Sequence, residues 1–193
     1  MFQDKIFNIN SEEEFTAVAL EVFNFQFKNN KVYRSFCDLL YVHPSDVKTI
    51  ESIPFLPIEF FKTRKVLSTT ANASITFSSS GTTGSVTSKH HVTDLSIYEK
   101  SYLDGFHQFY DSINEYVVLA LLPSYLEREG SSLIYMVDDL IKKSKHPESG
   151  FYLNNLDELK QKLVSLDKSG KKILLIGVSF ALLDLIEGYQ FSL

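Results

Sequence analysis

The stretch Tyr116-Val117-Val118-Leu119-Ala120-Leu121-Leu122 is apolar throughout. A continuous apolar run of this length is typical of a strand that is buried on both faces of a parallel sheet. A second buried strand is predicted at Ile173–Ile176, and apolar residues at helical spacing predict helices at Ser131–Ser144 and Asn155–Leu166 between the two strands. The pattern therefore indicates an α/β fold, three-layered, with a largely parallel sheet.

Further elements are predicted on both sides of this region. Ser74–Phe77 and Lys89–Val92 have the pattern of strands, and Thr93 or Asp94 is expected to cap a helix that runs to about Tyr110. Two shorter segments complete the pattern, a strand at Gly150–Leu153 and the start of a helix at Phe180–Ile186.

The first part of the chain has a helical texture. Ser11 is followed by Glu12, Glu13 and Glu14, which is the pattern of an N-cap with an acidic first turn and of a capping box. Asn29-Asn30 is expected to end this helix, and a shorter helix follows over Lys31–Leu40. We divide the chain into an N-terminal helical segment, a connector punctuated by Pro54 and Pro57 in which regular structure is short, and the first part of an incomplete α/β domain, at residues 1–43, 44–65 and 66–193.

Composition narrows the class of protein. The net charge of -5 disfavours nonspecific binding to nucleic acid, which needs a basic face. The single cysteine, Cys37, excludes an intrachain disulfide. No secretory signal pattern opens the chain, and the most apolar stretch, Ile173–Ile186, is interrupted by polar residues and is shorter than the roughly 20 residues that span a bilayer. We predict a soluble, cytoplasmic protein without a membrane span.

The strongest candidate for a functional site is the segment Thr76–Ser85, which reads Thr-Phe-Ser-Ser-Ser-Gly-Thr-Thr-Gly-Ser. Its backbone N–H groups are little obstructed by side chains and its hydroxyl groups add donors, which suits the binding of phosphate oxygens. It is not a P-loop of the G-x-x-x-x-G-K-[ST] type, because the second glycine and the lysine are absent. Since Lys89–Val92 reads as a strand, the segment is expected to join two strands; a plain polar turn is the competing interpretation.

The segment carries a family resemblance. The run Ser79-Ser80-Gly81-Thr82-Thr83-Gly84 resembles the phosphate-binding signature of the adenylate-forming superfamily. The wider pattern resembles one branch, the acyl-protein synthetase of bacterial bioluminescence, in five segments: Pro54–Lys62, Ser80–Gly84, Thr87–His90, Leu122–Arg128 and Gly177–Phe180. The resemblance runs from about residue 43 to residue 193, and its extension through the N-terminal helices is left open.

This resemblance implies an activity. Enzymes of the family join a fatty acid to ATP with Mg²⁺, form acyl-AMP and pyrophosphate, and pass the acyl group on to a cysteine of their own. It implies that Ser79, Ser80, Gly81, Thr82, Thr83 and Gly84 hold the ATP phosphates. The substrates implied are ATP and an acyl carboxylate, with a protein as acyl acceptor; the catalytic residues are not identified.

Two departures from the family pattern matter. The superfamily commonly has a lysine three positions after the second glycine, but Thr87 stands there. The nearest lysine is Lys89, which we assign to the phosphate site. The adenine-binding and metal-binding motifs of the superfamily lie further downstream than Leu193, so we expect a fragment that is inactive alone and prone to self-association. The alternative interpretation is a noncatalytic module that binds a nucleotide or an acyl group.

Three other groups of residues are candidates for a site. The charged segment Glu127–Glu129 follows a predicted strand. A ligand-binding site and a solvated turn explain it equally well. His90, His91 and Asp94 are compact, but zinc needs three or four ligands and the two histidines point to opposite faces of a strand, so a polar strand edge is favoured. Cys37 stands among apolar residues, as a buried helical cysteine does, and is not expected to be catalytic.

Overall fold

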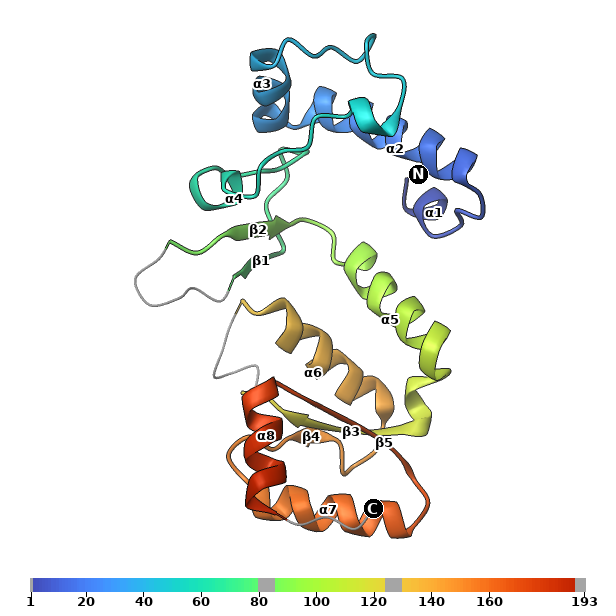
Figure 1. The fold of residues 1–193 in the computed structure, drawn as a ribbon, viewed down its shortest axis with the longest axis vertical. Helices are drawn as coiled ribbons and strands as arrows, with labels where there is room; N and C mark the ends of the chain where they lie inside the picture. The colour runs from blue at the N-terminus through green and yellow to red at the C-terminus, as the bar shows by residue number, and fades with distance from the viewer. Residues whose placement is uncertain (1, 80–85, 124–129, 190–193) are drawn as a thin grey trace. The chain divides into compact units, whose positions relative to one another are not determined.

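The computed structural model of the chain describes residues 2–79, 86–123 and 130–189, with side chains from residue 4 onward (Figure 1). The chain forms two compact units, residues 1–98 and residues 99–193, which are described separately below. The division falls inside a helix, later in the chain than the boundary at residue 66 that the sequence texture indicates.

The N-terminal unit begins with three helices, α1 (Phe2–Ile6), α2 (Glu12–Asn29) and α3 (Lys31–Leu39). Ser11 caps α2 as predicted, since its hydroxyl accepts a hydrogen bond from the Glu14 amide at 3.1 Å. The Glu14 carboxylate does not return to Ser11 as in a standard capping box; it accepts from the amide of Asn10 at 2.8 Å.

Asn30 joins α2 to α3 and explains the predicted break there. Its amide donates to the Gln26 carbonyl at 2.8 Å, which closes α2, and its side-chain Oδ1 accepts from the Tyr33 amide at 3.1 Å, which caps α3. Asn30 therefore supplies hydrogen-bonding groups both to the end of α2 and to the start of α3. Because these backbone groups have partners, the chain can turn at a buried position, and Asn30 is only 5% exposed.

The core of this unit consists of aromatic and apolar side chains from α2, α3 and the segment after them: Phe23, Phe27, Tyr33, Cys37 and Val47. The connector holds only the 3₁₀ turn η1 (Ile50–Ser52) and the four-residue α4 (Phe60–Thr63), as the prolines predicted. It is tied to α3 by Tyr33, whose hydroxyl donates to the Pro54 carbonyl at 2.7 Å.

A two-stranded antiparallel sheet follows, formed by β1 (Ile75–Ser78) and β2 (Lys89–Val92). Helix α5 (Ser96–Tyr110) comes next, and of its two predicted caps Asp94 is the one that accepts a hydrogen bond at the helix start, from the Ser96 amide at 2.9 Å. The short turn η2 (Ile113–Glu115) then leads into the second sheet.

The C-terminal unit is built on three parallel strands in the order β4-β3-β5. These strands are β3 (Tyr116–Leu121), β4 (Gly150–Phe151) and β5 (Lys172–Gly177). The predicted parallel α/β arrangement is thus confirmed in this small sheet, whereas the larger three-layer domain remains a prediction. The close pairing of β3 with β5 requires glycine at its end, because a Cβ on Gly177 would lie 2.8 Å from the Leu121 Cβ.

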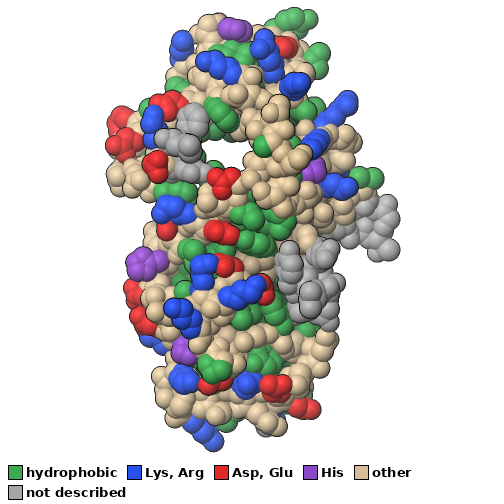
Figure 2. Space-filling view, turned by 180° about the vertical axis from the view of Figure 1, so that it is seen from behind, with side chains coloured by type: hydrophobic (Ala, Val, Ile, Leu, Met, Phe, Trp, Pro, Cys, Tyr) green, Lys and Arg blue, Asp and Glu red, His purple; other side chains and the backbone are tan. Residues whose placement is uncertain are grey.

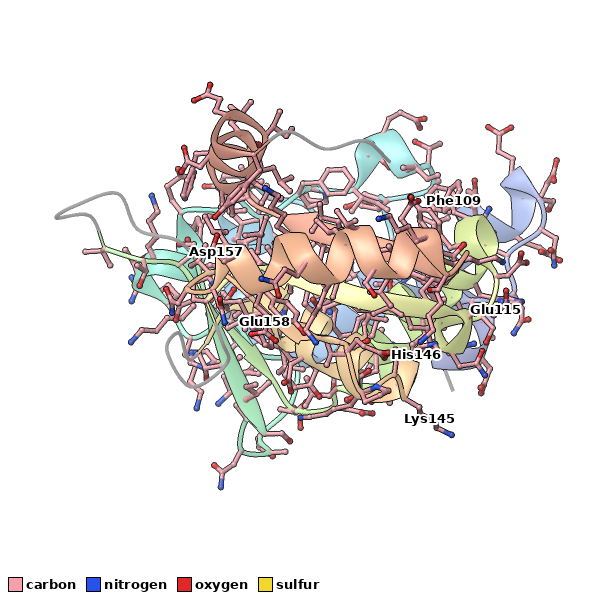
Figure 3. The ribbon with its side chains drawn as sticks, turned by 90° about the horizontal axis from the view of Figure 1, so that it is seen from below. Phe109, Glu115, Lys145, His146, Asp157 and Glu158 are labelled. Carbon is pink, nitrogen blue, oxygen red and sulfur yellow. The ribbon has the colours of Figure 1, made fainter. Side chains whose placement is uncertain are left out.

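Three helices complete this unit: α6 (Ser132–Ser144), α7 (Leu156–Lys168) and α8 (Ser179–Gly188). Alternate residues of β3 contact different helices, because side chains alternate across a strand. Val117, Leu119 and Leu121 pack with α7 and α8, whereas Ala120 and Leu122 pack with Val137 of α6. Asp157 and Glu158 lie at the start of α7 (Figure 3), where Asn155 accepts a hydrogen bond from the Glu158 amide at 3.3 Å.

Candidate functional site

The predicted phosphate-binding segment joins the two strands of the β1–β2 hairpin. Ser78 pairs with Lys89 at the end of the ladder, and the pairing continues one position further. The Ser79 amide donates to the Ser88 carbonyl at 3.0 Å, and the Ser88 amide donates to the Ser79 hydroxyl at 3.0 Å. The segment after Ser79 therefore connects two antiparallel strands, as the sequence predicted, and does not open a helix as in a P-loop.

Two of the predicted phosphate ligands belong to this stem. The Ser79 hydroxyl accepts one hydrogen bond within the hairpin and retains its proton, which it can donate to a phosphate oxygen. Lys89 is exposed directly opposite Ser78, at the point where the connecting segment leaves the stem. The other predicted phosphate-binding residues lie outside the described residues: Ser80, Gly81, Thr82, Thr83 and Gly84.

The two histidines of β2 make different contacts. The His90 ring lies edge-on to the Phe61 ring, with 5.9 Å between their centroids, and His91 Nδ1 is 2.9 Å from the Thr76 hydroxyl. The strand thus separates the two rings, as expected from its alternation. Among the described residues no three His, Cys, Asp or Glu side chains are grouped as metal ligands.

Burial lowers the pKa of His91 below its ordinary value of 6.5, and the nearby charges of Lys65, Lys89 and His90 act in the same direction. The unfolded chain therefore takes up a proton at this residue at higher pH than the folded chain does. This difference favours the folded state above the ordinary pKa of 6.5, and the contribution is lost as the pH falls through the lower pKa of the folded state.

We expect His91→Gln to lose less stability than the unsubstituted chain on acidification, because glutamine does not titrate. Urea unfolding of both proteins at about pH 7.5 and about pH 5.5 measures the difference. An equal loss of unfolding free energy in the two proteins would show that His91 contributes nothing to the pH dependence.

A hollow of about 640 Å³ lies beside the hairpin. Its polar wall includes His90, His91 and Asp94, and Phe25 and Phe61 contribute aromatic surface. A hollow of this size, with a few polar groups among apolar ones, is typical of a small-molecule site.

A polar cluster forms one wall of this hollow, in which Asn30 is buried and Gln26 and Ser68 are half-buried. Gln26 Oε1 accepts hydrogen bonds from the Ser68 hydroxyl at 2.5 Å and from Asn30 Nδ2 at 3.2 Å. Sequence reasoning missed this cluster, since Gln26 and Ser68 are far apart in the chain. The one local feature that pointed to it was Asn30, between two predicted helices.

The predicted turn at the end of β3 falls outside the described residues, since these exclude residues 124–129 and so Glu127, Arg128 and Glu129. In the described part of the C-terminal unit, Leu121 pairs with Gly177, so the segments that follow β3 and β5 leave the sheet at the same edge. Helix α8 starts at that edge, two residues after Gly177.

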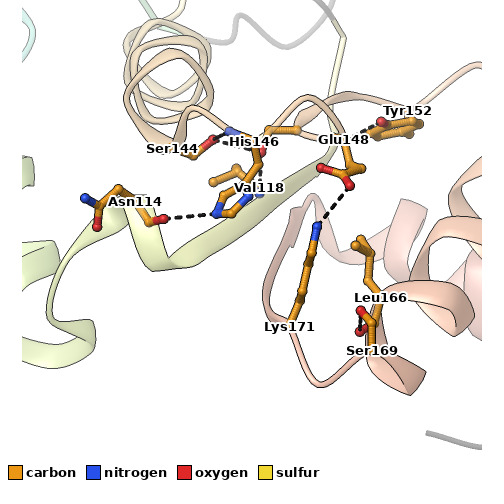
Figure 4. A network of polar contacts seen from close by, with 10 residues as sticks. Asn114, Val118, Ser144, His146, Glu148, Tyr152, Leu166, Ser169 and Lys171 are labelled. Carbon is orange, nitrogen blue, oxygen red and sulfur yellow. Dashed lines mark hydrogen bonds and ion pairs between the residues drawn. The ribbon is translucent and has the colours of Figure 1, made fainter.

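The clearest polar network of the C-terminal unit lies at the opposite edge, where β3 and β5 begin (Figure 4). Ser149 accepts from the Val118 amide at 2.9 Å and from the Ser144 hydroxyl at 2.8 Å, and Lys171 Nζ is 3.0 Å from Glu148 Oε1. These contacts join the end of α6 to the strands, so we assign the network to the fold and not to a substrate site.

Cys37 is fully buried in α3, as its apolar sequence neighbours predicted. Burial raises the pKa of its thiol, which disfavours the thiolate that a nucleophile needs. The environment is that of a core residue.

On the face that Figure 2 shows, Lys and Arg side chains of the C-terminal unit lie among Asp and Glu side chains. No helix in the described ranges is long and apolar enough to cross a membrane.

These features define a mixed α/β protein with a small parallel sheet and a separate hairpin, whose connection is rich in serine, threonine and glycine. A family model described as "Acyl-protein synthetase, LuxE" matches residues 4–114. Because the match spans more than half of the 193 residues, the chain belongs to this acyl-protein synthetase family. Searches of curated proteins and of solved structures gave no match.

Membership in this family indicates a ligase that handles acyl groups. The matched range contains the second half of α1, all of α2 and α3, the connector and the hairpin. The helices before residue 43 are therefore part of the family pattern, which the sequence resemblance had left open.

Proposed function

We propose that the protein activates a fatty or other carboxylic acid with ATP, forming acyl-AMP from which the acyl group passes to a protein or another acceptor. The observation that carries the proposal is the β1–β2 hairpin of an acyl-protein synthetase family member, because its strands are joined by the Gly-Thr-Thr-Gly segment. Backbone amides and hydroxyls in such a segment suit phosphate oxygens.

The proposed reaction has two steps. A carboxylate oxygen attacks the α-phosphorus of ATP, and the bond from that phosphorus to the oxygen bridging the β-phosphate breaks, releasing pyrophosphate. A nucleophile of the acceptor then attacks the acyl carbonyl and displaces AMP. Preorganised donors and positive charge accelerate such a step by stabilising the charge that develops on the phosphates.

The chain would contribute to the first of these steps. We propose that Ser79 and residues 80–84 bind the triphosphate of ATP. Lys89, at the end of the β1–β2 ladder, would bind the same negative charge. ATP enters as its magnesium complex. The metal is therefore part of the substrate.

ATP–pyrophosphate exchange on the natural full-length protein tests the proposal, and we expect exchange that depends on an added carboxylic acid. Lys89→Ala should reduce it about tenfold or more, since a hydrogen bond to a charged group contributes about 1.5–3 kcal/mol. Lys62→Ala, an exposed lysine of α4, is the matched control and should leave exchange unchanged. Binding of ATP or of an acid without any exchange would favour a noncatalytic binding module instead.

A further inference from the structure

A second, almost entirely apolar groove of about 400 Å³ lies in the N-terminal unit. Helix α2 contributes Phe15, Val18 and Val22 to it, and the connector contributes Ile53 and Phe55. Phe55 is 73% exposed, so the groove is open to solvent. An open apolar groove of this kind marks a binding site for an apolar ligand or partner.

Two of the polar groups in the groove already have hydrogen-bond partners. The Tyr33 hydroxyl donates to the Pro54 carbonyl, and Gln26 Oε1 accepts from Ser68 and Asn30. Among the described residues, no charged side chain lines the groove. Its walls therefore suit a hydrocarbon better than a charged ligand.

The groove adjoins the hollow beside the hairpin. Gln26, Tyr33 and Leu56 line both spaces, so one wall separates the apolar groove from the hollow, whose lining mixes polar and apolar side chains. Because Asp94 lines the hollow together with His90 and His91, the surface that suits a hydrocarbon is that of the groove.

We infer that the apolar groove binds the hydrocarbon chain of a fatty acyl substrate. The inference rests on the proposed function and extends it by giving the acyl chain a place. All residues that line the groove fall within the range that matches the acyl-protein synthetase family. The proposal therefore commits to an acyl chain and not to a second copy of the protein.

Two tryptophan variants of α2 test this inference, and the chain has no other tryptophan. Ala19 lines the groove, whereas Ala17 is exposed on the same helix and does not line it. Ala19→Trp should fill the groove and weaken binding of the fluorescent fatty acid cis-parinaric acid by about tenfold or more, and Ala17→Trp should not. Circular dichroism checks that both variants are folded.

A chain-length series on the unsubstituted protein gives an independent readout. Competition of saturated carboxylic acids with cis-parinaric acid should strengthen by up to about fourfold for each added methylene, until the groove is filled. These assays omit ATP, so they distinguish failure of the groove from failure of the exchange reaction.

Equal affinities of the two tryptophan variants, or no dependence on chain length, would overturn the inference. So would a dimer in sedimentation that Ala19→Trp dissociates, because a second copy would then occupy the groove. If Ala19→Trp does not fold, Val18→Thr is the substitute, and its polar wall should weaken binding several-fold.

Discussion

Thr83→Val is expected to weaken ATP binding by the natural full-length protein roughly 10- to 100-fold. Valine keeps the shape of threonine but removes the hydroxyl, and a hydrogen bond to a charged group contributes about 1.5–3 kcal/mol. Gly81→Val should have an effect at least as large, because a branched side chain would obstruct the approach of phosphate oxygens to the backbone amides. Isothermal titration calorimetry with MgATP measures both effects.

Thr70→Val is the matched control, because it makes the same substitution at an exposed position outside the hairpin. Its affinity for ATP should equal that of the unsubstituted protein. If Thr83→Val and Gly81→Val are both folded and both bind ATP normally, the segment is a polar turn and the assignment of the phosphates to it is wrong.

Most element positions could be predicted because their signals are local. Ser11 and Asn155 cap helices through hydrogen bonds to amides three residues away, and β3 is apolar because both of its faces are covered. The strand at Lys89–Val92 was predicted with the bounds that the structure gives. These features are encoded within a few residues of the chain.

The assignment of strands to sheets could not be predicted in the same way. In the part of the chain that the structure describes, β1 and β2 pair only with each other, whereas β3, β4 and β5 form a separate parallel sheet. A period-two pattern fixes which side chains share a face, but it does not select the partner strand. The sequence gives no local sign that β4 would shrink to Gly150 and Phe151.

In the candidate site, too, the local features could be predicted and the contacts between distant segments could not. The Gly-Thr-Thr-Gly segment was evident because its composition alone suits phosphate. The apolar groove and the hollow beside the hairpin could not be predicted from the sequence. Their shared wall is formed by Gln26 of α2, Tyr33 of α3 and Leu56 of the connector, which are distant from one another in the chain. Local sequence patterns do not indicate which distant segments of a chain contact one another.

The largest effect on stability is expected from Leu119→Ala in the C-terminal unit. Leu119 is fully buried in β3, the central strand, where it stands opposite Gly150 of β4 and Leu175 of β5. It packs in the same cluster as Leu159 and Leu163 of α7. Truncation removes transfer free energy and leaves a cavity that neighbours on two flanks cannot close, so the unfolding free energy should fall by about 2–5 kcal/mol.

Native-state hydrogen exchange of the C-terminal unit measures this loss, since a domain is stabilised by only about 5–15 kcal/mol in total. Peptides from β3, β5 and α7 should exchange faster in Leu119→Ala. Leu183→Ala is the control, because the same substitution in α8 removes a side chain that is 56% exposed and should change exchange little. Similar exchange in the two variants would mean that β3 is not the centre of the core, and the sheet order β4-β3-β5 would have to be revised.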